Sequence, residues 1–181
     1  MWSPSLSPEK VGLVEHACRR LPSSTQSSLP IPPDPLPGST YCFTAVAYDN
    51  AANERTSNQR CTSAPLDDRG LDRSTGWTRG TGSAFYKGTR TSAKPLGSVL
   101  SKKGVTARRL GIVATKCAGC GTVGVYVGSV KVGTVGLSST TTRHKQVLLL
   151  PAFASAKSGT VRLKVLSSGK PVRIDGLVVI R

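Results

Sequence analysis

Hydrophobic and polar positions alternate with a period of two over most of the chain from Tyr41 onward. In residues 41–48 every second side chain is aromatic or small and apolar, which suits a strand with one buried face. Similar short segments follow, separated by Gly, Ser and Thr, and they predict strands at 84–87, 98–101, 108–116, 122–127, 131–137, 145–150, 160–166 and 172–180. Many short strands without a helical period between them predict an all-β protein, an antiparallel sandwich or barrel.

Two turns are predicted between these segments. Residues 49–53 follow the first strand with polar and small residues, which indicates a turn. Gly128-Ser129 separates two apolar, alternating segments, and a two-residue connection of this kind requires a positive φ. We therefore expect a tight hairpin at Gly128-Ser129.

The first 38 residues have a different pattern. Eight of the 12 prolines precede Gly38, and six of them lie between Pro22 and Pro37, which favours an extended linker. Before the linker, Ser7 and Pro8 suit the start of a helix of about 13 residues, which is marginal in isolation. We expect residues 1–38 to be a short helix plus a Pro/Ser-rich arm, largely disordered.

Charge is distributed unevenly along the chain. Residues 1–72 hold 6 basic and 8 acidic side chains, net −2, whereas residues 73–181 hold 19 basic side chains and one acid, Asp175, net +18. A field of this sign attracts polyanions in general, such as nucleic acid, anionic lipid or the acidic polymers of a cell envelope. Charge alone does not choose among these partners.

One stretch near the middle of the chain resembles a known module. YCFTAVAYDNAANERTSNQRCTSAP is similar to the last two strands of a fibronectin type III domain, in which such a strand runs into an Asp-x-Ala-Gly-Asn turn, although Ala52 replaces the glycine here. The 25 residues are a fraction of a module of roughly 100 residues. The resemblance therefore implies only a partial fibronectin type III hairpin.

A second resemblance covers Gly76 to Arg181. GWTRGTGSAFYKGT, GTVGVYVGSVKVGTVGLSS, GTVRLKVLSSGK and VRIDGLVVI are similar to galactose-binding-like jelly-roll domains. Such domains are appended to bacterial secreted surface proteins and glycan-active enzymes, commonly as non-catalytic carbohydrate-binding or structural units. The resemblance thus implies a jelly-roll β-sandwich and an extracellular or cell-surface location.

These observations predict four regions: a helix and linker at 1–38, a partial fibronectin hairpin at 39–65, a connector at 66–75 and a jelly-roll domain at 76–181.

Four of the five cysteines are disulfide candidates. Cys42 and Cys61 lie on the two strands of one predicted hairpin, so their β-carbons can approach bonding distance, and with the secreted character implied above we favour a disulfide over two thiols. Cys117 and Cys120 form a CxxC pair that is compatible with structural zinc, a redox site or a disulfide that closes a loop. We favour the disulfide, and Cys18 is left over.

The scarcity of acids excludes several kinds of chemistry. Glycoside hydrolysis usually needs two carboxyl groups, and residues 74–174 contain none. The same scarcity argues against a calcium site made of side-chain carboxylates. His144 has no acidic neighbour that indicates catalysis, so we expect it at the surface. We expect no catalytic residue, no metal and no cofactor.

The predicted connector holds three acids, Asp67, Asp68 and Asp72. They form either a cation or catalytic cluster, or solvated charges that pair with Arg69 and Arg73. We favour the second interpretation, because exposed charges on linkers usually behave in this way.

Binding residues are sought among the aromatic and basic side chains. Trp77 and Tyr126 are expected to pack in the core or on the sheet, and Tyr86 suits either packing or ligand contact. The densest basic cluster is compatible with polyanion contact or with a solvated face. The candidate ligand contacts are Trp77, Tyr86, Lys102, Lys103, Arg108 and Arg109.

The favoured function is a non-catalytic extracellular or cell-surface module that binds polysaccharide or supports neighbouring domains. One alternative is a binder of polyanions, either a cell-wall polymer or nucleic acid, although no nucleic-acid-binding motif is present. The other is the C-terminal fragment of a larger secreted glycan-active enzyme. The N-terminus lacks a secretion signal and no apolar run is long enough to span a membrane, so either the protein is cytoplasmic or its natural start lies upstream.

Overall fold

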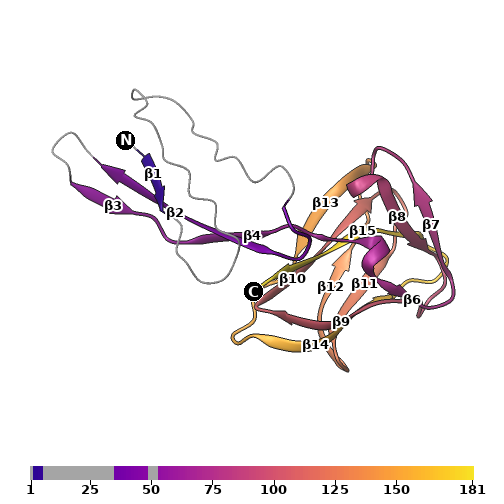
Figure 1. The fold of residues 1–181 in the computed structure, drawn as a ribbon. Helices are drawn as coiled ribbons and strands as arrows, with labels where there is room; N and C mark the ends of the chain where they lie inside the picture. Colours follow the sequence, from indigo (N-terminus) through magenta and orange to yellow (C-terminus); the bar gives the residue numbers. More distant parts are fainter. Residues whose placement is uncertain (1, 6–34, 49–52) are drawn as a thin grey trace. The chain divides into compact units, whose positions relative to one another are not determined.

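The computed structural model describes residues 2–5, 35–48 and 53–181, which form two compact units, 1–64 and 65–181 (Figure 1). Within these ranges the helical residues are two short 3-10 turns, η1 (Asp68–Gly70) and η2 (Tyr86–Gly88), and all other regular structure is β-strand. The described part of the chain has no helix that is long and apolar enough to cross a membrane. The helix and linker expected before residue 35 lie outside the described residues, apart from residues 2–5.

The first unit is built around one long strand. Strand β2 (Thr40–Tyr48) pairs with β1 (Trp2–Ser5) along one edge and with β3 (Glu54–Thr56) and then β4 (Arg60–Ser63) along the other. Residues 2–5 thus belong to the sheet of this unit. Cys42 lies directly opposite Cys61, with the Cα atoms 4.0 Å apart, and the two form a disulfide as expected. Whether this hairpin derives from a fibronectin module stays a prediction.

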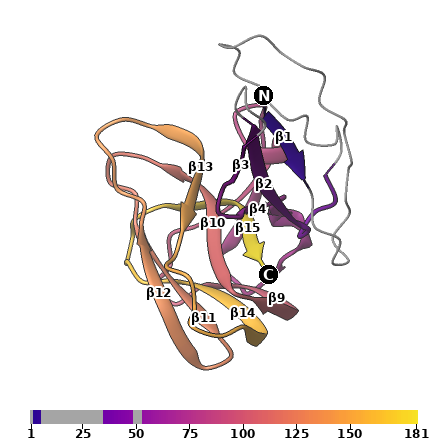
Figure 2. The same ribbon diagram turned by 90° about the vertical axis from the view of Figure 1, so that its left-hand side faces the viewer.

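The second unit contains two antiparallel sheets (Figures 1 and 2). The six-stranded sheet has the order β13-β10-β15-β8-β7, with β5 also paired to β15. Its strands are β5 (Leu66–Asp67), β7 (Trp77–Thr81), β8 (Thr89–Ala93), β10 (Arg109–Lys116), β13 (Arg143–Leu149) and β15 (Val172–Ile180).

The five-stranded sheet has the order β12-β11-β14-β9-β6, and Figure 2 shows β12, β11 and β14 side by side. Its strands are β6 (Asp72–Arg73), β9 (Val99–Ala107), β11 (Thr122–Val127), β12 (Val130–Gly136) and β14 (Lys157–Val165). The predicted fold class, an all-β antiparallel jelly-roll sandwich, is confirmed.

A single core holds the two sheets together. Alternate side chains of β14 enter it, because Val161, Leu163 and Val165 are buried while Arg162 and Lys164 between them are exposed. Trp77 is also in this core, which is one of the two places considered for it. The period of two in the sequence therefore corresponds directly to the inner and outer faces of a sheet.

The six-stranded sheet carries a second, smaller apolar cluster on its outer face. Val113 of β10 has the opposite orientation to its core neighbours Ile112 and Ala114, and it packs with Val178 and Ile180 of β15. Tyr86 packs against these three side chains. The loop that contains η2 thus covers part of this outer face.

Two features of the six-stranded sheet differ from the prediction. Residues 84–87, expected as a strand, lead into the 3-10 turn η2, where Lys87 has a φ of 49° and Gly88 a φ of 74°. Strands β7 and β8 were not predicted. The buried residues of β8 are Thr89, Thr91 and Ala93. Two of the three are polar, so this strand shows no alternation of hydrophobic and polar residues in the sequence.

The predictions at 122–127 and 172–180 match β11 and β15. The other predicted strands of this unit are correct to within three residues at each end, except that β9 continues to Ala107 and its predicted end was residue 101. The predicted hairpin is also confirmed, because Val127 pairs with Val130 across Gly128-Ser129 and Gly128 has a φ of 60°.

Candidate functional site

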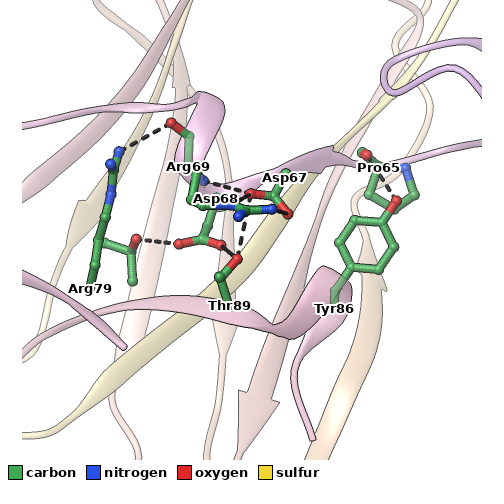
Figure 3. Close-up of polar contacts among 8 residues, drawn as sticks. Pro65, Asp67, Asp68, Arg69, Arg79, Tyr86 and Thr89 are labelled. Carbon is green, nitrogen blue, oxygen red and sulfur yellow. Dashed lines mark hydrogen bonds and ion pairs between the residues drawn. The ribbon is translucent and has the colours of Figure 1, made fainter. Parts of the chain in front are cut away.

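The segment expected as a connector packs against the sandwich through its acids (Figure 3). Asp68 is fully buried, and its carboxylate accepts hydrogen bonds from the hydroxyls of Thr89, at 2.7 Å, and of Thr91. The expectation of a solvated charge is therefore wrong for Asp68, because burial with two hydroxyl donors replaces its hydration. This carboxylate attaches the segment to β8.

The neighbouring acids lie nearer the surface. Asp67 caps η1 by accepting from the backbone amide of Arg69, and it pairs with the Arg69 side chain at 2.8 Å, as expected (Figure 3). Asp72 is exposed on β6. Asp67 and Asp68 share the hydroxyl of Thr89, at 3.5 Å and 2.7 Å, whereas Asp72 is exposed, and these contacts fix the segment to the sandwich.

Tyr86 is also engaged in contacts that support the fold. Its hydroxyl donates to the carbonyl oxygen of Pro65 at 3.2 Å, and its ring packs on the outer apolar cluster (Figure 3). Burial raises the pKa of Tyr86, and the nearby charge of Asp67 raises it further. Of its two interpretations, packing is the one that the contacts support.

Asp175 is a buried carboxyl group at an irregular point of the six-stranded sheet. Strand β15 pairs with β8 up to Ile174 and with β5 from Gly176, and opposite β10 the register shifts at the same place. Asp175 therefore lies at a β-bulge, a feature that redirects a side chain.

The environment of Asp175 disfavours its charged form. Its side chain is fully buried, and burial together with the charge of Asp68 raises its pKa to about 7. The amides of Lys145 and Tyr86 and the charge of Arg90 act in the opposite direction. These amides face the carboxylate outside regular hydrogen-bond geometry, since neither oxygen has a hydrogen-bond partner among the described residues.

His144, expected at the surface, is half-buried. Its Nδ1 lies 3.1 Å from the Thr115 hydroxyl, and its ring meets the ring of Phe85 edge-on at 5.3 Å between centroids. One contact is a hydrogen bond and the other is a contact between two rings, and both are made within the fold.

The six candidate ligand contacts do not meet in one place. Trp77 is 3% exposed in the core, and Tyr86 lies on the outer face of the six-stranded sheet. The basic candidates lie on β9 or directly after it. Lys102 donates to the Gly70 carbonyl and Arg109 donates to the Leu150 carbonyl, whereas Lys103 and Arg108 are exposed.

The CxxC pair forms a disulfide in the turn between β10 and β11. Both cysteines are buried, and the amide of Cys120 donates to the carbonyl of Cys117 at 3.1 Å. Of the three possibilities, the structure contains the disulfide that closes a loop.

An aromatic ring lies on the outer face of the five-stranded sheet. Tyr126 of β11 is half-buried there, which is the second of the two places expected for it, on the sheet and outside the core. Cross-strand pairing places it in one row with side chains from all five strands. We call this the Tyr126 row; it consists of Lys131, Tyr126, Arg162, Ser101 and Asp72.

The adjacent row explains how the ring is held. It contains Gly124, flanked by Thr134 and Lys164. A β-carbon at Gly124 would lie 2.9 Å from Cε2 of Tyr126 and 3.0 Å from Cδ1 of Leu166, so the ring lies across the glycine. The missing side chain at Gly124 thus provides the space for Tyr126.

The Tyr126 row combines a planar apolar ring with hydrogen-bond donors. Lys131 and Arg162 are exposed, and Arg162 is held by a bond to the Gly128 carbonyl at 3.0 Å. A ring with such donors around it suits a ligand that has both an apolar face and hydroxyl groups. The alternation along β14 predicts that Arg162 faces outward. The pairing register of β11 with β12, which shifts between Val125 and Tyr126, cannot be predicted from the sequence.

No protein-family model and no curated protein sequence matches this chain. Several solved structures resemble it in fold. The xanthan lyase of Paenibacillus matches with a TM-score of 0.51 and 12% identity over 78% of this chain and 19% of its own. CsCBM6-3 of Clostridium stercorarium, solved with cellobiose, matches with a TM-score of 0.49 and 16% identity over 64% of this chain and 92% of its own.

A third similar structure is the C-terminal CBM6 of LamC from Zobellia galactanivorans, with a TM-score of 0.43 and 14% identity over 64% of this chain and 97% of its own. The similar structures are therefore carbohydrate-binding modules and glycan-active enzymes. At these identities the resemblance concerns the fold alone.

Proposed function

We propose that this protein is a non-catalytic, extracellular or cell-surface module that binds carbohydrate and supports neighbouring domains. The observation that carries the proposal is the Tyr126 ring lying across Gly124 within an exposed row of polar side chains. The binding face is the outer face of the five-stranded sheet.

Binding at this face combines two kinds of contact. The Tyr126 ring stacks on the apolar face of one sugar, and Lys131 and Arg162 on the neighbouring strands donate to its hydroxyls. Strands lie about 4.8 Å apart, so these three side chains cover about 10 Å. A face of this size engages a short segment of a polysaccharide chain.

A binding role agrees with the distribution of acids. Residues 74–174 contain no carboxyl side chain, and the four acids of the second unit are engaged with Thr89 and Thr91 (Asp68), paired with Arg69 (Asp67), exposed on β6 (Asp72), or buried (Asp175). Glycoside hydrolysis usually needs two carboxyl groups across the bond. We therefore assign no catalytic residue.

Co-sedimentation of the full chain with insoluble neutral polysaccharides, cellulose and xylan, tests this proposal. We expect retention that persists at high salt, because stacking on a neutral sugar involves no ion pairing. Tyr126→Ala should abolish retention, whereas Tyr48→Ala, which removes an exposed tyrosine from the first unit, should not. Unchanged retention of the Tyr126 variant would overturn the assignment of this face.

The second candidate function is polyanion binding. Residues 65–181 hold 20 basic and 4 acidic side chains, net +16, which favours an anionic cell-wall polymer or nucleic acid. Retention only on anionic polymers, lost steeply as salt rises, would support this candidate over the first. Absence of binding to any polymer would leave the supporting role.

A further inference from the structure

A cavity of about 320 Å³ lies on the six-stranded sheet where β7, β8 and β15 run side by side. Thr78, Ser92 and Arg173 form a cross-strand row in it, one residue from each strand. Ser92 and Arg173 alternate with core residues on their strands, so the cavity opens on the outer face of this sheet. It is therefore separate from the Tyr126 row, which lies on the other sheet.

Arg90 is held rigidly at one side of this cavity. Its Nη1 donates to the hydroxyl of Ser92 at 2.7 Å, and its guanidinium carbon lies 4.8 Å from the centroid of the Phe85 ring. Its side chain also packs against Gly80, where a β-carbon would lie 3.5 Å from Nε. A guanidinium fixed in this way loses little entropy when a ligand binds.

The cavity has a strong positive charge. Three cations line it, Arg90, Lys94 and Arg173, and no acid is among its lining residues. Asp175, the one acid in residues 73–181, does not line the cavity; it is buried, and its pKa is raised to about 7, so it is only partly charged at neutral pH. Cations gathered in a concave site without counter-charges attract an anion.

The shape and lining of the cavity restrict the kind of anion. Its volume is at the lower end for small-molecule sites, so it takes one unit of a polymer. No aromatic ring lines it, which removes the stacking contact that nucleic-acid bases use. Hydroxyls of Thr78 and Ser92 lie beside the cations, and Pro95 and Pro171 give an apolar rim.

We propose that this cavity binds the acidic group of a charged sugar, a carboxylate or a sulfate, within an acidic polysaccharide. The forked donors of Arg173 match the paired oxygens of such groups, Arg90 and Lys94 add positive charge, and Thr78 and Ser92 are placed to bond the sugar hydroxyls. The polymeric nature of the ligand rests on the proposed carbohydrate-binding function. The preference for an anion rests on the cavity alone.

Titration of the full chain with matched sugars tests this site. Galacturonate and galactose differ in the acidic group, as do polygalacturonate and its methyl ester, and dextran sulfate and dextran separate a sulfate from a carboxylate source. We expect the acidic member of at least one pair to bind and to shift the backbone amide signals of Ser92 and Arg173. Equal binding of galactose and galacturonate, with no preference for either acidic polymer, would overturn the proposal.

Two double variants with the same change in charge show whether the cavity is responsible. Arg173→Gln with Lys94→Gln should weaken binding of the acidic sugar by about tenfold or more, as expected for charge-assisted bonds. Arg143→Gln with Lys157→Gln removes two exposed cations outside the cavity and should change binding less than threefold. Equal weakening in both double variants would mean that net charge alone is responsible. Binding of DNA that depends on the cavity and is tighter than binding of the acidic sugar would assign the site to nucleic acid. Either result overturns the proposal.

The two proposals fail separately. Tyr126→Ala should leave galacturonate binding unchanged, because Tyr126 lies on the other sheet. Anion binding with no neutral-polysaccharide retention would reject the proposed function but keep the cavity, and the opposite result would reject the cavity alone. Thermal melting of each variant confirms that it is folded.

Discussion

The outer face of the six-stranded sheet carries a second apolar cluster and a buried acid, whereas the outer face of the five-stranded sheet carries exposed lysines and arginines. On β10 and β15, Val113 and Ile180 are buried on the outer side. On β14, Arg162 and Lys164 are exposed at corresponding outer positions. The two sheets share one core but have different solvent environments outside it.

The difference shows how one sandwich can hold two kinds of surface. Where the η2 loop covers the six-stranded sheet, its strands are packed on both sides, and Arg90 at the cavity is held by Ser92 and Phe85. The five-stranded sheet is packed on one side, so its outer residues can change without altering the core. Four predictions test this comparison.

The largest expected effect separates the inner and outer faces of β14. Leu163→Ala should lower the free energy of unfolding by about 3 kcal/mol, because it leaves a cavity in the shared core, whereas the adjacent Arg162→Ala should change it by less than about 0.5 kcal/mol. Urea denaturation measures both values. Similar losses would mean that the five-stranded sheet is also packed on its outer face.

The second effect concerns Asp68 of η1, whose buried carboxylate bonds to β8. Asp68→Ala leaves the hydroxyls of Thr89 and Thr91 without their acceptor and should cost about 2 kcal/mol. The matched control is Asp72→Ala, at an exposed acid of the five-stranded sheet, which should be close to neutral. A neutral Asp68 variant would show that this segment is not attached through its carboxylate.

The third effect depends on pH. The folded pKa of Asp175, about 7, exceeds the ordinary value of 3.8, so the folded state binds the proton more tightly and its stability falls as pH rises from about 4 to about 7. Asp175→Asn should raise stability at pH 8 by on the order of 1–3 kcal/mol and have a smaller effect at pH 4. Melting temperatures at both pH values measure this, and an equal shift at both would contradict a neutral buried carboxyl.

The smallest effect on stability is expected on the five-stranded sheet. Gly124→Ala places a β-carbon 2.9 Å from Cε2 of Tyr126 and should displace the ring, with a change in stability below about 1 kcal/mol. Retention on neutral polysaccharide should fall. Gly136→Ala, on the neighbouring strand with no atom within 4 Å of the new β-carbon, is the control and should retain binding.

Hydrophobic alternation was sufficient to predict the strands that supply large apolar side chains to the core, such as β11 and β15. Hydrophobic alternation did not predict β7 and β8. The buried residues Thr89 and Thr91 of β8 are polar, and their hydroxyls are satisfied in the interior by hydrogen bonds to Asp68. The candidate site was predicted less well. Tyr126 was assigned to packing because a small sandwich with few aromatic residues needs its large apolar side chains inside, and the sequence does not tell which face of a sheet an aromatic residue occupies.

The sequence by itself determined the all-β class, the antiparallel sandwich, the hairpin at Gly128 and the concentration of positive charge after residue 72. These features depend on neighbouring residues or on composition, so they are visible in a one-dimensional pattern. The tertiary structure alone decided that Arg162 lies beside Tyr126, that Arg90 and Arg173 share a cavity, and that Asp68 is buried. These contacts join strands far apart in the chain, and their register depends on bulges and cross-strand pairing, which local sequence does not specify.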